Sequence, residues 1–545
     1  MGTLLLVNLA YLLITLVIGW LAWRRTTHTP EDYFLGGRST RALVLFMAVF
    51  GTNVQPASNF FIDGAPLTGQ SDHLVNLQFG LESSSRLSQQ TLLLSYASDR
   101  VTSRGAAGLR CQALTIAATS PAPAAPTGAA TWPVERAWTP AEEALHSAWL
   151  RALFAAPGDA PLQLARLDLA TRDPQRNLLH DALGEAEDSD PGLELRPDTA
   201  DLPYTLRAYW AWKRRLPFAF RTCTPGPANS AARCEPARSN LDPDPAAPAG
   251  ALARAQRFLA RTLPRAVQPA NLRTAPEAAA SDLYPVALAR HVLRPGTAYA
   301  DPYGHVLVLV GQRAGLLLAV EAQADGSILG RRFTPGNFLH HPDPALGGSG
   351  FLRFRPTLER GGAVLQLDDD AITASLAHGD LWTGQAGLGL AEFQDRVDAL
   401  LVTGARDPFL VQRDLVDDLT LAARERVAAV ERGASPPPGR RGVVPMPTGF
   451  EIFAGTGPWQ RLATPGRDLR LLAALRAVDG FVARVRSNPA AFGTPEGERG
   501  EPVLTQLIHE RERLLADRTL RYRRSDGSEH TLSLADLVIR RPALE

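Results

Sequence analysis

The segment RPGTAYADPYGHVLVLVG, Arg294 to Gly311, is followed closely by GLLLAVEAQADGSILGRRF, Gly315 to Phe333. Both contain short apolar runs of the kind that form buried strands, and Asp325 with Gly326 supplies turn residues. This pattern predicts consecutive antiparallel strands. Because segments with helical periodicity come earlier in the chain, the order of helices followed by strands predicts an α+β fold.

Helix signals precede the strands. Thr139 and Glu142 give an N-cap and a capping-box acid around a first-turn proline, so a helix is expected to begin there and the globular domain near Trp132. Asp198 is a second expected N-cap, with Thr199 in the first turn of the helix that follows. A third helical pattern covers ALARAQRFLARTL, residues 251–263.

Composition restricts the class of protein. A chain of 545 residues is long enough for two to four domains, and its net charge of +1 comes without a basic stripe, so no nucleic-acid partner is expected. Lys213 is the only lysine, which indicates GC-rich coding rather than a binding device. The sequence has no P-loop, no G-x-G-x-x-G after a strand and no G-x-S-x-G elbow. We therefore expect no cofactor.

Three cysteines allow at most one disulfide within the chain. Cys223 and Cys234 flank a loop rich in Pro, Gly and Asn, TCTPGPANSAARC, that is short enough for such a bond in an oxidising compartment. Two unpaired loop thiols are the equal alternative. Cys111 lies in a segment without recognisable features.

The first residues indicate a membrane helix. No charged residue occurs from Met1 to Trp23, and this length is close to the roughly 20 apolar residues that a bilayer-spanning helix needs. A cleaved signal peptide would carry basic residues before its apolar core, whereas Arg24 and Arg25 follow it here. Those arginines predict that the next loop is cytoplasmic.

A second apolar run covers residues 42–67 and is interrupted by Gly51, Asn53 and Pro56. If it crosses the membrane, the rest of the chain is extracytoplasmic, which agrees with a disulfide. If it does not, the rest is cytoplasmic. We therefore predict one or two transmembrane helices, and favour an inner-membrane protein whose soluble part is periplasmic.

The membrane region carries a resemblance. EDYFLGGR, Glu31 to Arg38, resembles the segment that follows the first helix in the sodium:solute symporter family. The similarity covers about the first 60 residues, and no inverted repeats of helices follow that would enclose a transport site. Residues 1–67 are accordingly interpreted as a membrane anchor, with a truncated or fused symporter fragment as the alternative function.

The remaining boundaries come from composition and periodicity. Residues 68–131 are polar and then rich in Ala and Pro, which predicts a disordered linker. Residues 132–388 form the expected α+β domain. Residues 389–545 predict a helical accessory region with helices at 393–401, 411–431, 468–485 and 503–518, and a terminal hairpin around Asp526 and Gly527. The alternating charges of these helices are interpreted as solvated faces.

Two motifs in the α+β region resemble the NlpC family of papain-like cell-wall peptidases. DTADLPYTLRAYWAW resembles the family's "DCSG" helix start, with Thr199 at the cysteine position, and LRPGTAY followed by GHVLVLVG resembles its histidine strand, with His305 at the histidine position. The resemblance covers about residues 196–323. It implies a papain-like fold, Thr199 as nucleophile, His305 as general base, and Glu321 or Gln323 as the group that orients the imidazole.

The threonine departs from the family pattern. A hydroxyl is a weaker nucleophile than a thiolate, and a residue within the chain lacks the terminal amine that assists known threonine nucleophiles. The resemblance therefore predicts an inactive or weakly active amidase or peptidase, anchored in the membrane, with peptidoglycan or envelope peptides as partners. A non-enzymatic envelope scaffold remains a further alternative.

Simpler interpretations stand beside these roles. His305 is also compatible with a plain strand residue, and Glu321 with pairing to an arginine from the insertion around the cysteine loop. Asp201 and Arg207 are expected to be surface charges.

No metal site is expected. His340 and His341 are adjacent loop residues without a spaced third ligand. Residues 368–370 are an acidic run without the glycine and the spaced oxygens of a calcium loop, so they are interpreted as a solvated turn.

Overall fold

The computed structural model describes residues 91–96, 110–115 and, with short interruptions, 130–540. The predicted membrane segment, residues 1–67, lies outside the described residues, and so does most of the predicted linker. Among the helices of the described part, none combines the length and apolar character needed to cross a membrane. The contacts divide the chain into one unit of residues 1–67 and 77–122 and a second of residues 68–76 and 123–545.

The first unit contains two described strands. β1 (Thr91–Tyr96) and β2 (Arg110–Thr115) pair antiparallel, with Ser95 opposite Cys111. Both strands fall within the segment for which the sequence predicts a linker. The apolar run TLLLSY is long enough for one strand, but its polar surroundings dominate the composition on which the prediction depended.

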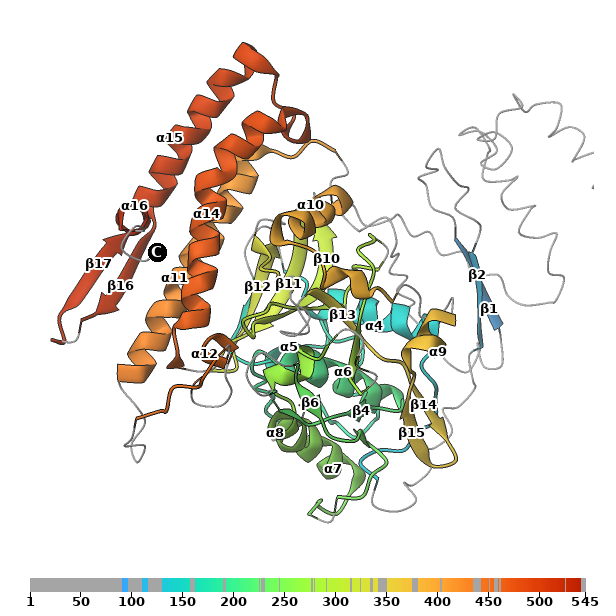
Figure 1. The fold of residues 1–545 in the computed structure, drawn as a ribbon. Coiled ribbons are helices and arrows are strands. Elements are labelled where there is room, and N and C mark those ends of the chain that lie inside the picture. Colours follow the sequence, from blue (N-terminus) through green and yellow to red (C-terminus); the bar gives the residue numbers. More distant parts are fainter. Residues whose placement is uncertain are drawn as a thin grey trace, which may run out of the picture. The chain divides into compact units, whose positions relative to one another are not determined.

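A seven-stranded antiparallel sheet forms the centre of the second unit, in the order β3-β12-β11-β10-β9-β13-β8 (Figure 1). The strands expected from the sequence are consecutive neighbours in it: β9 (Ala298–Ala300), β10 (Val306–Arg313), β11 (Leu316–Ala322) and β12 (Ile328–Phe333). The outer strands are β3 (Gln163–Leu164), β13 (Gly350–Phe354) and β8 (Leu283–Pro285). The α+β class is confirmed.

The turn between β11 and β12 has the predicted Asp325 and Gly326. Gly326 has a φ of +82°, and a Cβ at this position would lie 2.7 Å from the Cβ of Arg196. Glycine is therefore required both by the left-handed backbone and by the close approach. The contact places this turn against the segment that leads into the helix after Asp198.

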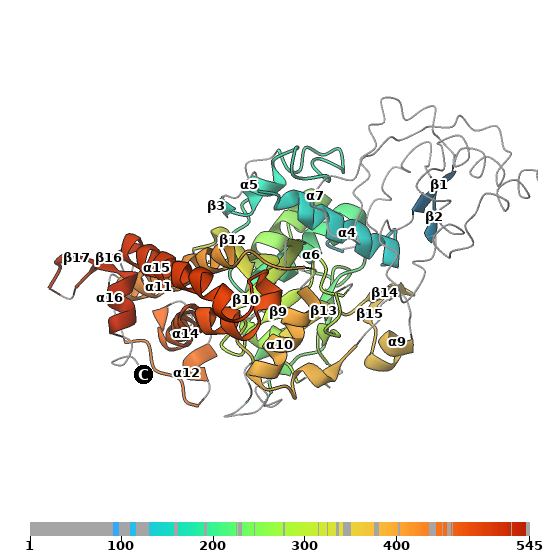
Figure 2. The ribbon, with the colours of Figure 1, turned by 90° about the horizontal axis from the view of Figure 1, so that it is seen from above.

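The two faces of the sheet are covered by different helices. One face packs against α4 (Pro140–Leu153), α6 (Asp201–Arg214) and α7 (Ala251–Arg257), and the other against α10 (Leu390–Leu401). Figure 2 shows α4 on one side of β10 and β13 and α10 on the other. Strand side chains alternate accordingly: Val306, Val308, Val320 and Ala322 face the α6 side, and Leu307, Leu309, Leu317 and Ala319 the α10 side.

The predicted helix start at Thr139 is observed, and the one at Asp198 is displaced by two residues. The Thr139 hydroxyl accepts a hydrogen bond from the Glu142 N–H at the start of α4. Before α6, a carboxylate oxygen of Asp198 accepts from the N–H groups of Ala200 and Asp201, at 3.0 and 3.3 Å. α6 nevertheless begins at Asp201 with Ala200 at the N-cap and no side-chain cap, so the N-cap lies two residues after the predicted Asp198, and Thr199 precedes the helix instead of lying in its first turn.

The third predicted helix is interrupted. After α7 the chain forms a π-helical turn at Phe258–Thr262 and continues as α8 (Leu263–Ala266). Pro264 has no N–H to donate to the carbonyl of residue 260, so the regular ladder cannot continue through this point.

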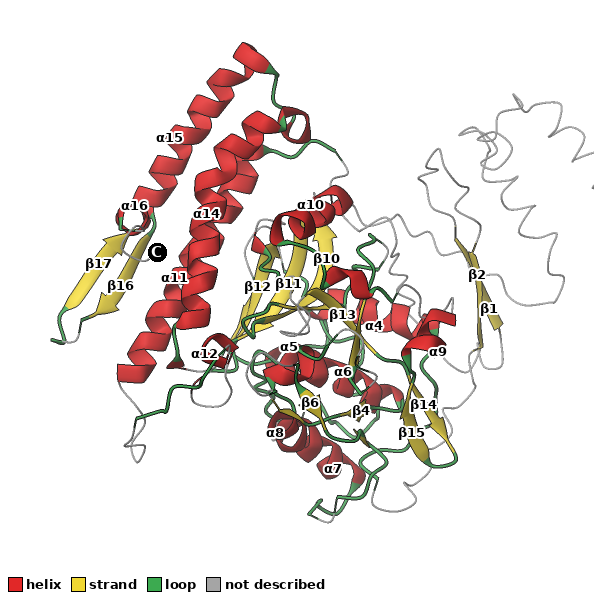
Figure 3. Cartoon of the chain, viewed as in Figure 1, coloured by secondary structure: helices red, strands yellow, loops and turns green. Residues whose placement is uncertain are grey.

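Helices dominate after residue 389. α11 (Pro408–Ala434), α14 (Pro465–Ser487) and α15 (Glu501–Asp517) share a core with the hairpin of β16 (Thr519–Arg523) and β17 (Glu529–Ser533) and with α16 (Leu534–Ile539) (Figure 3). The hairpin turn contains Asp526 and Gly527, as predicted. Phe393, Val397 and Leu401 of α10 belong to the core of the sheet, so the expected boundary at 389 is not a break in packing.

Short elements complete the second unit. These are α5 (Asp168–Thr171), α9 (Asp369–Ala374), α12 (Glu451–Ala454) and the strand pairs β4 (Ala219–Phe220) with β7 (Arg238–Ser239), β5 (Cys223–Thr224) with β6 (Arg233–Cys234), and β14 (Thr357–Arg360) with β15 (Ala363–Gln366). In the described part of the chain, 3₁₀ turns cover Pro269–Leu272, Thr383–Gln385, Pro489–Phe492 and Gly497–Gly500.

Candidate functional site

The turn between β9 and β10 positions His305. A carboxylate oxygen of Asp301 accepts hydrogen bonds from the backbone N–H groups of Tyr303 and His305, both at 2.8 Å. Aspartate side chains commonly order a turn in this way. The imidazole is thereby held directly before the first residue of β10.

His305 is in contact with Glu321 of β11. Its Nε2 lies 2.7 Å from a carboxylate oxygen of Glu321, whose side chain is fully buried. Gln323 donates from its amide to the other carboxylate oxygen at 2.7 Å, and Arg331 of β12 donates to the same oxygen at 2.8 Å. The structure therefore brings three of the four predicted site residues together, and adds Arg331.

Two acids of α11 complete this group. Arg331 also lies 3.3 Å from a carboxylate oxygen of Glu425 and 3.5 Å from one of Asp418. Because the α11 charges were interpreted as a solvated face, this part of the prediction is wrong. Asp414, Asp418, Ala422 and Glu425 recur on one side of α11, and this spacing is the sequence signal that would have indicated a buried polar face.

Electrostatics differ sharply among these carboxylates. Burial raises the pKa of Glu321, but the charges of Arg331 and His305 outweigh it and hold that pKa below its ordinary value. Burial raises the pKa of Asp418 to about 7, and raises that of Glu425, because burial and the neighbouring carboxylates together outweigh the nearby arginines. Glu321 is thus the carboxylate that stays ionised.

A cavity of about 40 Å³ lies beside His305. Its polar lining comes from Asp301, His305, Arg331, Asp418, Glu425 and Arg470, and its apolar lining includes Leu307 and Phe333. A space of this size holds one or a few water molecules. It is far too small for a peptide substrate.

Thr199 makes a different contact. Its hydroxyl donates to the backbone carbonyl of Ala322 at 3.2 Å, and among the described residues it does not line the cavity beside His305. Thr199 lies two residues before α6, which packs on one face of the sheet. Leu307, two residues after His305, and Ala319, two residues before Glu321, face the α10 side. Alternation along the strands therefore puts the His305 and Glu321 side chains on the face opposite α6.

The cysteine pair is joined. Cys223 and Cys234 form a disulfide between β5 and β6, where they are directly opposite each other. Of the two alternatives that the sequence left open, the structure has the bonded one. Cys223 is consequently not positioned to replace Thr199 as a nucleophile.

Asp201 and Arg207 correct a prediction. Both were expected at the surface, yet both are buried on α6. Arg207 binds both carboxylate oxygens of Glu143, at 2.6 and 3.0 Å, and its guanidinium lies 3.2 Å from the ring centre of Trp138. The reason is that α6 is buried on all sides, so its polar residues lie inside the core instead of facing water.

The remaining polar motifs have structural partners. His340 Nε2 lies 2.7 Å from the carbonyl of Gln385, and its ring stacks on Phe393 at 4.1 Å between centroids. Asp368 accepts from the N–H of Ala371 at the start of α9, and Asp369 pairs with Arg355 at 2.5 Å.

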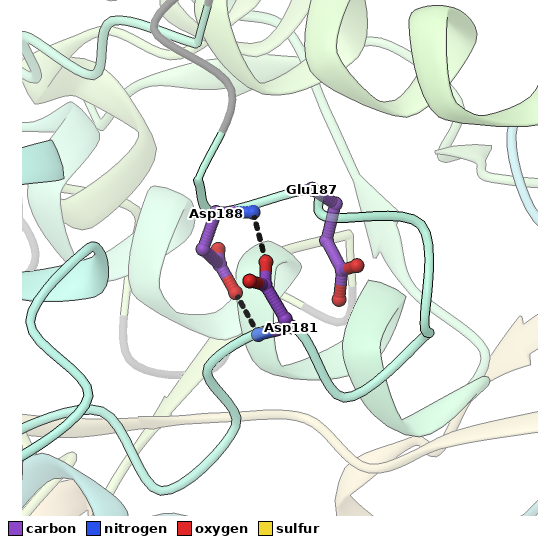
Figure 4. Close-up of side chains that lie close together, drawn as sticks. All are labelled: Asp181, Glu187 and Asp188. Atoms are coloured by element: carbon purple, nitrogen blue, oxygen red, sulfur yellow. Dashed lines mark hydrogen bonds between the residues drawn. The ribbon is translucent and has the colours of Figure 1, made fainter.

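A second charged cluster lies at the C-terminal end of α6. Asp181, Glu187 and Asp188 each offer a carboxylate oxygen within 4.8 Å of the others, which is the one group of possible metal ligands in the described part of the chain (Figure 4). The Lys213 ammonium donates to both Glu187 and Asp188. It supplies the positive charge that a bound cation would bring. Reading Lys213 only as coding bias missed this contact.

Comparisons with known proteins give no assignment. No known family, no curated protein and no solved structure matches the chain significantly.

Proposed function

We propose that this chain is a membrane-tethered protein of the bacterial envelope whose α+β domain binds or scaffolds envelope peptides without hydrolysing them. Kinship with the NlpC-type peptidases is part of the proposal and depends on the motifs at residues 196–210 and 293–311. Anchoring through residues 1–67 and a periplasmic location are further parts, which depend on the uncharged N-terminal run and agree with the disulfide.

The observation that carries the proposal is the separate engagement of Thr199 and His305. A general base must lie within hydrogen-bond reach of the proton that it removes, directly or through one water. The Thr199 hydroxyl donates to the Ala322 carbonyl, while the imidazole contacts Glu321. Neither group is arranged to activate the other.

The surroundings of His305 support the same conclusion. Its partner Glu321 also binds Arg331, and Arg331 binds the acids of α11. The imidazole is therefore part of the contact that holds α11 against the sheet. The small cavity beside it offers no room for the peptide stem of a cell-wall fragment.

The test is hydrolysis of a peptidoglycan-derived peptide by the full chain in detergent. Wild type, Thr199→Ala and Thr199→Cys are compared, and circular dichroism establishes that each is folded. We expect no product from wild type or from the alanine variant. Turnover by wild type that Thr199→Ala abolishes would contradict the proposal.

The cysteine variant addresses the kinship separately. Product from Thr199→Cys alone would support an inherited, silenced site. If that variant is inactive too, the motifs no longer support kinship with the NlpC-type peptidases. Cosedimentation with isolated cell-wall sacculi tests the binding role, and a chain that stays in the supernatant contradicts it.

A further inference from the structure

Lys213 lies in an environment unlike that of any ordinary surface lysine. It occupies the last turn of α6, and the side chains of Lys213, Glu187 and Asp188 have no solvent exposure. The ammonium nitrogen donates to Glu187 and lies 2.5 Å from Oδ2 of Asp188. The ring centres of Trp212 and Tyr209 are 5.2 and 5.6 Å away. An amine is thus held against two carboxylates in surroundings that exclude water.

The choice of lysine at this position is chemically specific. The other buried ion pairs described above use arginine, whose planar fork suits a carboxylate, as in Arg207 with Glu143 and Arg331 with Glu321. Lysine occurs once among the 57 basic residues. Coding bias explains why lysines are few, but not why one remains in the most completely buried pair. Lysine differs from arginine in that its amine can act as a nucleophile.

The carboxyl group of Asp188 is held by donors on both oxygens. Oδ1 accepts from the hydroxyl of Tyr209 at 2.6 Å, and Oδ2 accepts from the N–H of Asp181 at 2.8 Å as well as from Lys213. Tyr209 is itself fixed by the amide of Asn177 at 2.8 Å. Donors aimed at a carboxyl oxygen stabilise the negative charge that develops there when a nucleophile adds to the carbon.

Glu187 is positioned beside the same amine. Its two oxygens accept from the N–H groups of Leu183 and Glu185, at 2.8 and 3.1 Å. Burial raises the pKa of Glu187, but the hydrogen bonds from Lys213 and from the backbone bring that pKa below its ordinary value. Glu187 is accordingly ionised, and its direct contact with the ammonium makes it the nearest group through which a proton of Lys213 can pass.

We propose that Lys213 and Asp188 form an intramolecular isopeptide bond, with Glu187 relaying the protons. Lys213 gives a proton to Glu187, and the neutral amine adds to Cγ of Asp188 while Tyr209 binds Oδ1. The bond from Cγ to Oδ2 then breaks. Oδ2 leaves as water with two protons of the former ammonium, the third stays on the amide nitrogen, and Glu187 ends as the carboxylate that it was at the start.

The product would join two elements that are 25 residues apart in the chain. It would fix the loop that contains Asp181, Glu187 and Asp188 to the end of α6. Close, fixed placement of the reacting groups supplies the effective concentration that such a reaction needs. No oxidant or cofactor enters the balance, and the inference does not depend on the proposed envelope function.

Peptide mapping of the full chain by mass spectrometry tests this directly. Trypsin cuts after Arg176 and Arg207 but not between Arg196 and Pro197, so Asp188 falls in the peptide 177–207 and Lys213 in the next one. We expect one joined species, 177–207 linked to 208–214, lighter by one water than its two parts and uncut after the acylated Lys213. Separate peptides, with cleavage after Lys213, from a chain that circular dichroism shows to be folded would overturn the inference and leave a buried ion pair only.

Variants identify the roles. Lys213→Arg keeps the charge and must abolish the joined species. Asp188→Asn should yield a product of the same mass as wild type, because attack on the amide releases ammonia instead of water. Glu187→Gln should strongly reduce the joined species, and full formation in that variant would remove Glu187 from the mechanism. If a variant does not fold, the wild-type map alone decides whether the bond exists.

Discussion

Two of the buried charge clusters in the second unit compensate their buried charges in different ways. The cluster around Arg331 draws its groups from two neighbouring strands and from α11, and one guanidinium is shared by three carboxylates. The cluster around Lys213 combines a single loop with one helix, and a compact ammonium contacts two carboxylates. The first joins α11 to the strands, and the second joins the loop that contains Glu187 and Asp188 to the last turn of α6.

The difference also appears in how the acids ionise. In the Arg331 cluster, burial raises the pKa of Asp418 and Glu425, so these acids are undercompensated. In the Lys213 cluster, the pKa of Glu187 is lowered in spite of burial. Backbone N–H groups aimed at Glu187 account for part of this contrast, since they stabilise the charged form.

The largest effect is expected from removing the central acid of the Arg331 cluster. Glu321→Ala leaves Arg331 and His305 buried without their shared partner, and should lower the free energy of unfolding by about 3–5 kcal/mol. Denaturant unfolding followed by tryptophan fluorescence measures it. The exposed pair of Glu392 with Arg396 is the matched control, where Glu392→Ala should cost less than about 0.5 kcal/mol. Similar losses in the two variants would break the comparison.

Exchanging the cation should be costly in the Lys213 cluster. Lys213→Arg forces a larger, planar group into a site with no solvent exposure, and should lower the free energy of unfolding by about 1–3 kcal/mol. The same denaturant experiment applies. Arg513→Lys, at an exposed pair with Glu510, should leave the denaturation midpoint unchanged. If Lys213→Arg has the same free energy of unfolding as wild type, the site tolerates either cation and this prediction is wrong.

The pH dependence of the free energy of unfolding should also distinguish the two clusters. Burial raises the pKa of Asp418 to about 7 in the folded chain, while the unfolded chain keeps a value near 4. Between these values the folded state binds more protons, so the free energy of unfolding falls as the pH rises from about 4 to about 7. Asp418→Asn should remove part of this decline. At pH 8 the free energy of unfolding of the variant should exceed that of wild type by about 1–2 kcal/mol.

Two features make this measurement specific. Burial also raises the pKa of Glu425, so the Asp418→Asn variant should still lose some stability as the pH rises. Asp417→Asn, at the neighbouring residue that pairs with Arg518 near the surface, should keep the wild-type pH profile. A wild-type stability that rises steadily from pH 4 to pH 7 would contradict the assignment of Asp418.

The smallest effect belongs to Thr199. Thr199→Val removes the hydroxyl that donates to Ala322 at similar side-chain volume, and should lower the free energy of unfolding by about 1 kcal/mol. Denaturant unfolding again provides the value. A loss as large as that of Glu321→Ala would mean that Thr199 belongs to the buried charge network, and the separation of the two sites would have to be abandoned.

Local signals in the sequence predicted much of the fold. The cap at Thr139, the turn at Asp325 and Gly326, and the terminal hairpin all depend on neighbouring residues, and each is present in the structure. The contact between His305 and Glu321 was expected as well. These features could be predicted because a cap or a turn is determined within a few residues.

The faces of the sheet could not be predicted in the same way. HVLVLV, from His305 to Val310, is apolar at both odd and even positions, since the sheet is covered on both sides. Periodicity therefore does not tell which face meets α6, and a shift of one residue exchanges the faces. The partners Arg331, Asp418 and Glu425 lie up to 120 residues from His305 (425 minus 305), where no short motif connects them.

The reactivity of a cysteine at position 199 tests the separation of Thr199 from His305 most directly. In a Cys111→Ser background, the pH dependence of alkylation by iodoacetamide is compared for Thr199→Cys with and without His305→Gln. An adjacent imidazolium lowers a thiol pKa well below its ordinary value of about 8.5. We predict the same alkylation midpoint with either residue at 305. A midpoint more than about one pH unit lower when His305 is present would contradict the account, because it would show that the two positions share one electrostatic site.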